Sequence, residues 1–143
     1  MPYEPYRRSV YYYETDQMGI VHHSNYVRWF EEARVHLLQQ AQLGYHELER
    51  MGIRSVILGY SCDNHKPACF GDTFVIHVRS ADFTGVRITF LYQVFRQSDG
   101  ELLATGETRH CFVSTQMMPI NLKRKYPAVC ATLVHMLPEE RDG

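Results

Sequence analysis

A short segment near the start of the chain gathers residue types that could carry out hydrolysis. Residues 13–26 read YETDQMGIVHHSNY. Asp16 supplies a carboxylate, and Gly19 permits a bend that a residue with a Cβ would resist. His22 and His23 follow, and both can exchange a proton near neutral pH. A carboxylate, a bend and two histidines within so few residues are typical of a hydrolytic site.

The same segment runs into a predicted helix. Ser24 and Asn25 are good N-cap residues, and the apolar residues that follow them have helical spacing. The first turn of a helix has N–H groups without intrahelical partners and a partial positive charge, so it can polarise a carbonyl oxygen. Asp16 could then act as a general base toward water or attack the carbonyl carbon directly. His23, or less readily His22, could orient the water or transfer a proton.

Other interpretations of these residues stay open at this point. An Asp in a loop before a helix usually caps a turn, and Asp16 taken alone fits that role. The His22-His23 pair could bind a metal, but adjacent residues rarely point at one ion and no third ligand has a suitable spacing. We therefore expect neither a metal nor a cofactor. His65 and Lys66 could contact a substrate or its phosphates, although an ordinary exposed loop is favoured there.

The remaining residues predict one long helix followed by a sheet. A strand over residues 6–13 leads into the motif, and a helix with a broad apolar face extends from residue 24 to Gly44. A short helix, four strands joined by tight turns and a helical tail then follow, over residues 45–50, 53–68, 73–79, 86–95, 102–114 and 127–137. Successive hairpins imply an antiparallel sheet, so the predicted class is α+β with the helix packed on one sheet face.

Composition excludes several classes of protein. The 143 residues predict one domain, 1–143, that can bury a core. A net charge of −1 gives no electrostatic reason to bind nucleic acid. No apolar run approaches the length of an integral membrane segment. The four cysteines are scattered and show no ligand or disulfide spacing, which favours a reducing, cytoplasmic location (Cys62, Cys69, Cys111 and Cys130).

The order of elements, the motif at residues 13–26 and the sequence WFEEAR at residues 29–34 together resemble the hotdog fold. More narrowly, the chain is similar to the 4-hydroxybenzoyl-CoA thioesterase-like acyl-CoA thioesterases, of the YbgC and FadM type. The resemblance runs from about Val10 to Pro119. It implies an antiparallel sheet wrapped around a long central helix, and hydrolysis of an acyl-CoA thioester. It also implies a homo-oligomer, a dimer or a homotetramer built as a dimer of dimers, with sites at the subunit interface.

The resemblance also assigns roles to residues. Asp16 becomes the catalytic carboxylate, and the backbone N–H near His23 becomes the donor that polarises the thioester carbonyl. The substrate would contact four further residues of the motif: Gly19, Val21, His22 and Tyr26. Relatives bind the CoA phosphates through basic side chains, and Arg87 is the basic residue of the segment 83–87 that matches one such position.

Two other functions remain compatible with the sequence. One is a hotdog hydratase or dehydratase that acts on an enoyl or 3-hydroxyacyl thioester. The other is a non-catalytic module that binds acyl-CoA or a protein partner. The local pattern of Thr15, Asp16 and Gly19 favours the thioesterase. An oligomer has a physical reason besides the resemblance, because pairing between subunits would remove exposed sheet edges from solvent.

Overall fold

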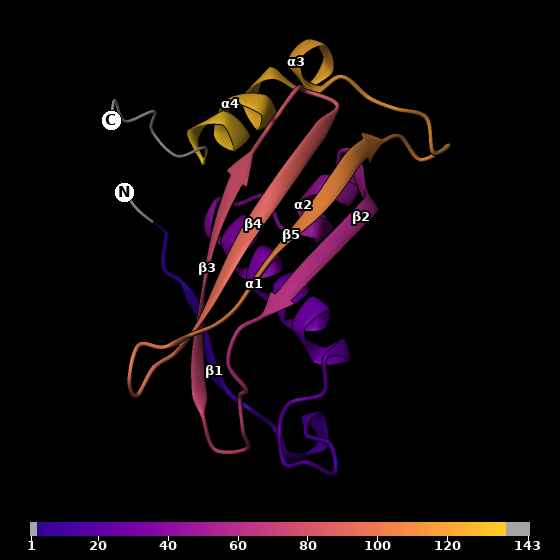
Figure 1. Cartoon of the computed structure of the whole chain (residues 1–143). Coiled ribbons are helices and arrows are strands. Elements are labelled where there is room, and N and C mark those ends of the chain that lie inside the picture. The colour runs from indigo at the N-terminus through magenta and orange to yellow at the C-terminus, as the bar shows by residue number, and fades with distance from the viewer. Residues whose placement is uncertain (1–2, 137–143) are drawn as a thin grey trace.

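The computed structural model describes residues 3–136, and in this range five strands form one antiparallel sheet in the order β1-β3-β4-β5-β2 (Figure 1). The strands are β1 (Tyr6–Ser9), β2 (Arg54–Asn64), β3 (Thr73–Ala81), β4 (Arg87–Arg96) and β5 (Leu102–Val113). The helices are the short 3₁₀ helix η1 (Tyr12–Glu14), α1 (Ser24–Gln40), α2 (Tyr45–Arg50), α3 (Leu122–Lys125) and α4 (Pro127–His135). The predicted α+β class is confirmed.

Helix α1 lies across one face of the sheet, behind the strands in Figure 1. The alternate residues of β4 that face it are buried, as their spacing predicts (Ile88, Phe90, Tyr92 and Val94). Trp29 of α1 stacks on Phe74 with ring centroids 4.0 Å apart, and Phe30 stacks on Tyr92 at 4.4 Å. Such aromatic pairs bury large apolar areas and fix how the helix sits on the sheet.

Strand β5 approaches α1 closely because one of its residues lacks a side chain. A Cβ at Gly106 would clash with the Phe30 ring and would lie 2.7 Å from the carbonyl oxygen of Ser61 in the neighbouring β2. Neither obstacle moves easily, since Phe30 is held by its stack on Tyr92. Gly106 therefore sets how near the helix can come to the sheet.

A polar cluster, which the sequence does not predict, lies buried between α1 and the sheet. Arg34 is 3% exposed, and its guanidinium donates to the hydroxyls of Tyr45 at 2.8 Å and Tyr92 at 3.0 Å. The hydroxyl oxygen of Thr108 is within hydrogen-bond distance of two groups. It lies 2.6 Å from the Tyr92 hydroxyl and 2.7 Å from His110 Nε2. Because a buried cation is costly without hydrogen bonds, these oxygens are what allow Arg34 to face the core. Burial and the positive charge of Arg34 lower the pKa of His110 to about 3.

Several predicted element bounds need correction, and one of them is the strand predicted over residues 53–68, which as β2 ends at Asn64. The first strand ends at Ser9 rather than continuing to Tyr13, because the Tyr11 N–H donates to the Glu14 carboxylate and the chain turns into η1. Helix α1 begins at Ser24, so Ser24 and Asn25 lie inside it instead of capping it. The last helix is α4, preceded by the unpredicted α3, and residue 137 of the predicted tail lies outside the described residues.

Two further findings concern the described part of the chain. Among residues 3–136, no helix combines the length and the apolar character that crossing a membrane requires. The four cysteines form no disulfide with one another in the structure.

Candidate active site

Asp16 is carried by a small hairpin, residues 15–21, that precedes α1. Thr15 and Val21 pair across it, the Asp16 N–H donates to the Ile20 carbonyl at 2.9 Å, and the Gly19 N–H donates to the Asp16 carbonyl at 3.0 Å. Gly19 has a φ of +80°, a left-handed conformation that glycine adopts without strain. The predicted bend at Gly19 is therefore present, and it turns the chain back toward the helix.

The two carboxylate oxygens of Asp16 have different environments. Oδ1 accepts a hydrogen bond from the Met18 N–H at 2.8 Å, which is the turn-capping role expected of an isolated Asp. Oδ2 accepts no hydrogen bond from any of the described residues 3–136. One oxygen thus fixes the orientation of the carboxylate while the other remains available to a water molecule or a substrate.

The N-terminus of α1 presents a backbone donor close to this hairpin. His23 occupies the N-cap position, and its side chain accepts no hydrogen bond from the N–H groups of the first turn. The Ser24 N–H donates to His22 Nδ1 at 3.2 Å, and the Asn25 N–H donates to the His22 carbonyl at 3.0 Å. The His23 N–H has no acceptor among residues 3–136. It therefore lies at the positive end of the helix with its hydrogen available.

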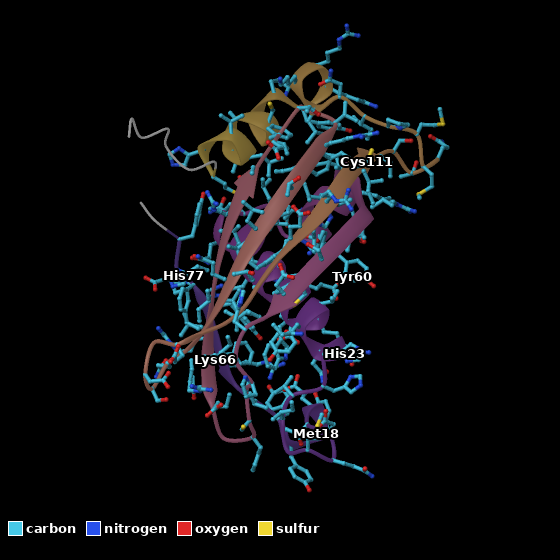
Figure 2. All side chains as sticks on the ribbon, in the orientation of Figure 1. Met18, His23, Tyr60, Lys66, His77 and Cys111 are labelled. Atoms are coloured by element: carbon cyan, nitrogen blue, oxygen red, sulfur yellow. The ribbon has the colours of Figure 1, made fainter. Side chains whose placement is uncertain are left out.

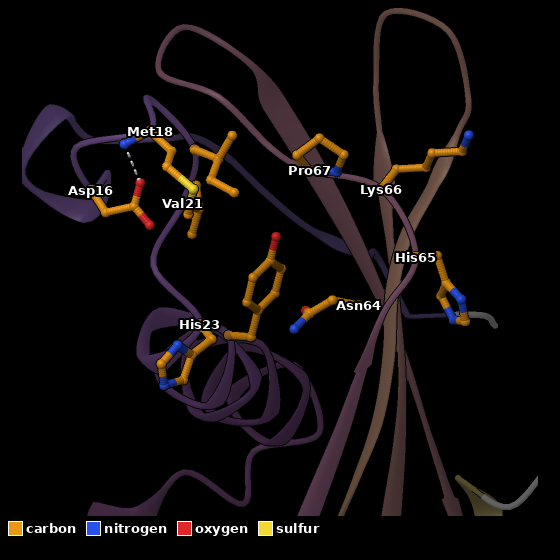
Figure 3. A pocket seen from close by; sticks show the side chains of 10 residues that line it. Asp16, Met18, Val21, His23, Asn64, His65, Lys66 and Pro67 are labelled. Atoms are coloured by element: carbon orange, nitrogen blue, oxygen red, sulfur yellow. Dashed lines mark hydrogen bonds between the residues drawn. The ribbon is translucent and has the colours of Figure 1, made fainter.

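A pocket of about 390 Å³ opens between the hairpin, the start of α1 and the segment after β2 (Figure 3). It is lined by Asp16, Met18, Ile20, Val21, His23, Tyr26, Asn64, His65, Lys66 and Pro67. The two walls are tied together, because the Val21 N–H donates to the Ala68 carbonyl at 2.8 Å. Burial raises the pKa of Tyr26 to about 12, so its phenol keeps its proton near neutral pH.

Four of the predicted site residues line this pocket: Asp16, Val21, His23 and Tyr26. The other two predicted site residues of the motif, Gly19 and His22, lie beside the pocket. Gly19 forms the hairpin turn, and His22 is exposed, with its ring 4.2 Å from that of His23. In the described part of the chain, His22 and His23 belong to no group of three or more metal-ligand side chains.

Arg87 lies at the other end of the sheet from the pocket. It pairs with Cys111, whereas Asn64 at the pocket pairs with Ala104. The seven residues of β5 between these two pairs (111 minus 104) span about 23 Å at roughly 3.3 Å per residue. Arg87 therefore does not line this pocket within its own chain, and its contact with CoA stays a prediction.

The segment after β2 contributes residues that sequence reasoning missed or favoured as an ordinary loop. His65 and Lys66 line the pocket on its far side, and Figure 3 shows both side chains turned away from Asp16. His65 Nε2 lies 3.1 Å from Thr105 Oγ1, and both the His65 and the Lys66 N–H groups donate to the Leu103 carbonyl. Asn64, the last residue of β2, which the sequence did not single out, also lines the pocket (Figure 3).

Comparisons with known proteins identify the family of the chain. The family model "Thioesterase-like superfamily" matches residues 10–129. A relative from Aquifex aeolicus named "Putative esterase" is 41% identical over 108 residues, which cover 76% of this chain and 83% of that protein. "Putative acyl-CoA thioesterase YneP" from Bacillus subtilis is 32% identical over 119 residues, covering 82% of this chain and 86% of that protein.

A solved structure gives the same result for the fold. The DHNA-CoA thioesterase from Staphylococcus aureus superposes with a TM-score of 0.86 and 26% sequence identity, covering 94% of this chain and 91% of that one. The predicted hotdog fold and the predicted enzyme class, thioester hydrolase, are thus confirmed. The chain belongs to the thioesterase-like superfamily.

Proposed function

We propose that this protein hydrolyses an acyl-CoA thioester to a free acid and CoA in the pocket between the hairpin, α1 and the segment after β2. One observation carries the proposal. Asp16 and His23 line the same pocket, and neither Asp16 Oδ2 nor the His23 N–H has a hydrogen-bond partner among residues 3–136. A thioester carbonyl placed there would have a donor for its oxygen and a carboxylate for the attack on its carbon.

Two routes use these groups. In the first, Asp16 accepts a proton from a water molecule whose oxygen attacks the carbonyl carbon, and the thiolate leaves and takes up that proton. In the second, an Asp16 oxygen attacks, the thiolate leaves, and water cleaves the resulting mixed anhydride. Both routes place negative charge on the carbonyl oxygen, where the His23 N–H would stabilise it. The His23 ring would serve as a proton carrier at most, since it is exposed and lies beside the His22 ring at the surface.

The lining of the pocket supports an acyl group as the bound portion. Met18, Ile20 and Val21 offer apolar surface on the wall next to Asp16. Tyr26 also lines the pocket and is only 3% exposed. Gly19 and His22 would hold the wall in place from outside rather than contact the acyl chain. Lys66 and, from another subunit, Arg87 are our candidates for the CoA phosphates.

Assembly of subunits is part of the same proposal. Strand β2 pairs only with β5 in the described sheet, so its other edge is open. Three apolar residues on this edge strand are exposed, Ile57, Leu58 and Tyr60, at 42%, 51% and 58%. An open edge with exposed apolar side chains favours pairing with a second copy, which would give a dimer or a dimer of dimers. Because β2 ends at Asn64, the pocket would then lie at the interface. A cytoplasmic location completes the proposal.

The proposal is tested with a panel of acyl-CoAs, from short to long and aromatic, by measuring release of free CoA thiol. Wild type should turn over at least one of them, and Asp16→Asn should lower kcat by about 10³-fold, because the base or nucleophile is lost. Hydration of enoyl-CoAs without thiol release would instead support the hydratase, and tight binding without either reaction would support a binding module.

A second measurement separates the two routes. Turnover in water labelled with heavy oxygen, followed by mass analysis of the protein, shows whether label enters Asp16. Label in Asp16 requires the mixed anhydride and would therefore exclude a role as general base alone.

A further inference from the structure

Glu14 is a buried carboxylate next to the hairpin that carries Asp16. Its side chain is 4% exposed and accepts two hydrogen bonds from Arg8, at 3.0 Å to Oε1 and 2.7 Å to Oε2. Trp29 Nε1 donates to Oε2 at 2.8 Å, and the Tyr11 N–H donates to Oε1 at 2.8 Å. One carboxylate thus joins β1, the turn η1 and the second turn of α1.

The backbone of the same residue holds the hairpin and the start of α1. The Glu14 carbonyl accepts the His22 N–H at 2.8 Å, which closes the base of the hairpin. It also accepts the side-chain N–H of Asn25 at 2.9 Å, which ties the first turn of α1 to the same point. Asp16 and His23 lie on either side of this junction. Displacement of Glu14 would therefore move them relative to each other.

We infer that Glu14 is a positioning residue: its carboxylate, held by Arg8 and Trp29, fixes the hairpin of Asp16 against the N-terminus of α1. The inference rests on the proposed function, since it concerns the alignment of Asp16 with the His23 N–H. It does not make Glu14 a catalytic residue, because Glu14 does not line the pocket.

The hydrogen-bonding partners explain why a carboxylate is needed at this position. All four partners are donors: Arg8 Nη1 and Nη2, Trp29 Nε1 and the Tyr11 N–H. A carboxylate accepts hydrogen bonds at both oxygens, whereas the amide of a glutamine would turn an NH₂ group toward a donor. Replacement of Glu14 by glutamine, which has nearly the same shape, would therefore disturb the junction without opening a cavity.

Arg8 also provides a matched control. Its Nε donates to Glu32 Oε1 at 2.9 Å, so Glu32 is a second carboxylate partner of the same guanidinium. Glu32 also accepts from the Tyr6 hydroxyl at 2.9 Å, but it makes no hydrogen bond to the hairpin. Glu32→Gln therefore weakens the contacts of Arg8 while leaving the junction between the hairpin and α1 intact.

The experiment compares Glu14→Gln with Glu32→Gln in the full chain, at a temperature where thermal unfolding shows each variant to be folded. We expect Glu14→Gln to lower kcat for thiol release by about 100-fold, as a displacement of about 1 Å between reacting groups would. KM should change by no more than about two-fold, because the acyl-binding wall is unaltered. Glu32→Gln should leave both constants within about two-fold of wild type. Amide exchange at His22 should be faster in Glu14→Gln and unchanged in Glu32→Gln.

Other outcomes overturn the inference. Normal kcat in Glu14→Gln, or equal losses in both variants, would show that Glu14 does not position the site. If Glu14→Gln fails to fold, Trp29→Phe takes its place, because it removes one of the four donors to the Glu14 carboxylate. It should lower kcat by about ten-fold, and an unchanged kcat would refute the positioning role of Glu14. Should wild type hydrolyse no acyl-CoA, the proposed function fails on its own. Amide exchange at His22 then decides the inference, because unchanged exchange in Glu14→Gln contradicts it.

Discussion

His110 makes the stability of the fold depend on pH in a way that the structure allows us to estimate. The ring is 1% exposed, and both of its nitrogens have partners: Nε2 lies 2.7 Å from Thr108 Oγ1 and Nδ1 lies 3.2 Å from Ser55 Oγ. Burial and the nearby Arg34 lower the pKa of His110 to about 3, from 6.5 for an ordinary histidine. The folded protein therefore holds His110 neutral where the unfolded chain would bind a proton.

The direction and size of the effect follow from this difference. Because the unfolded chain binds a proton below pH 6.5 and the folded protein does not, stability falls as the pH falls from 6.5 toward 3. The slope in that range is about 1.4 kcal/mol per pH unit for one group. Between pH 7 and pH 5 the free energy of unfolding should therefore decrease by about 2 kcal/mol through His110.

The assay is urea unfolding of wild type and His110→Asn at pH 7 and pH 5. Asn cannot titrate, so its free energy of unfolding should decrease by about 2 kcal/mol less than that of wild type over this range. His46→Asn, at an exposed position on α2, is the control and should show the pH dependence of wild type. Equal pH dependence in His110→Asn and wild type would show that His110 titrates normally and would refute the reasoning.

Two further predictions concern packing and assembly. Gly106→Ala should lower the free energy of unfolding by about 3 kcal/mol, because the added methyl group meets the Phe30 ring and the Ser61 carbonyl. Urea unfolding measures this change. A decrease below about 0.5 kcal/mol would mean that α1 can shift to make room. Tyr60→Lys should convert the proposed oligomer to monomers, because a charge on the open edge of β2 opposes strand pairing. Sedimentation velocity measures the size of the assembly, and an oligomer of unchanged size would place the interface elsewhere.

Much of the fold could be predicted because it depends on local periodicity. The strand over residues 86–95 follows from the alternation of its side chains, and Ile88, Phe90, Tyr92 and Val94 form its buried face. The helical spacing of the apolar residues from Tyr26 onward likewise identified the buried face of α1. Such patterns need no knowledge of distant contacts, because strand and helix geometry fix which side chains share a face.

The errors arose where distant residues determine the local structure. Residues 10–13 have a composition typical of strands. The Tyr11 N–H and Arg8 instead donate hydrogen bonds to the buried Glu14 carboxylate, so the strand ends at Ser9. The burial of Arg34 on α1, which the sequence analysis did not address, depends on the hydroxyls of Tyr92 and Tyr45. No local pattern in the sequence indicates either arrangement.

The candidate site was predictable on one wall only. The motif at residues 13–26 supplies Asp16 and His23 from one continuous segment, so their proximity follows from the sequence. The opposite wall depends on the pairing of Ile20 with Cys69, which brings the segment after β2 against the hairpin. His65 and Lys66 consequently looked like an exposed loop. Arg87 was assigned through the resemblance to relatives with a basic residue at this position, and its place at the far end of the sheet depends on strand register.

The central claim is that the carboxylate of Asp16 is required for thioester hydrolysis. The most direct test is kcat for thiol release from the best acyl-CoA of the panel, compared between Asp16→Asn and Asp63→Asn. Asp63 is an exposed acid on β2, next to Asn64 but outside the pocket lining, so it controls for loss of charge nearby. We predict a loss of about 10³-fold for Asp16→Asn and a change within about two-fold for Asp63→Asn. A folded Asp16→Asn variant with near-normal kcat would contradict the account.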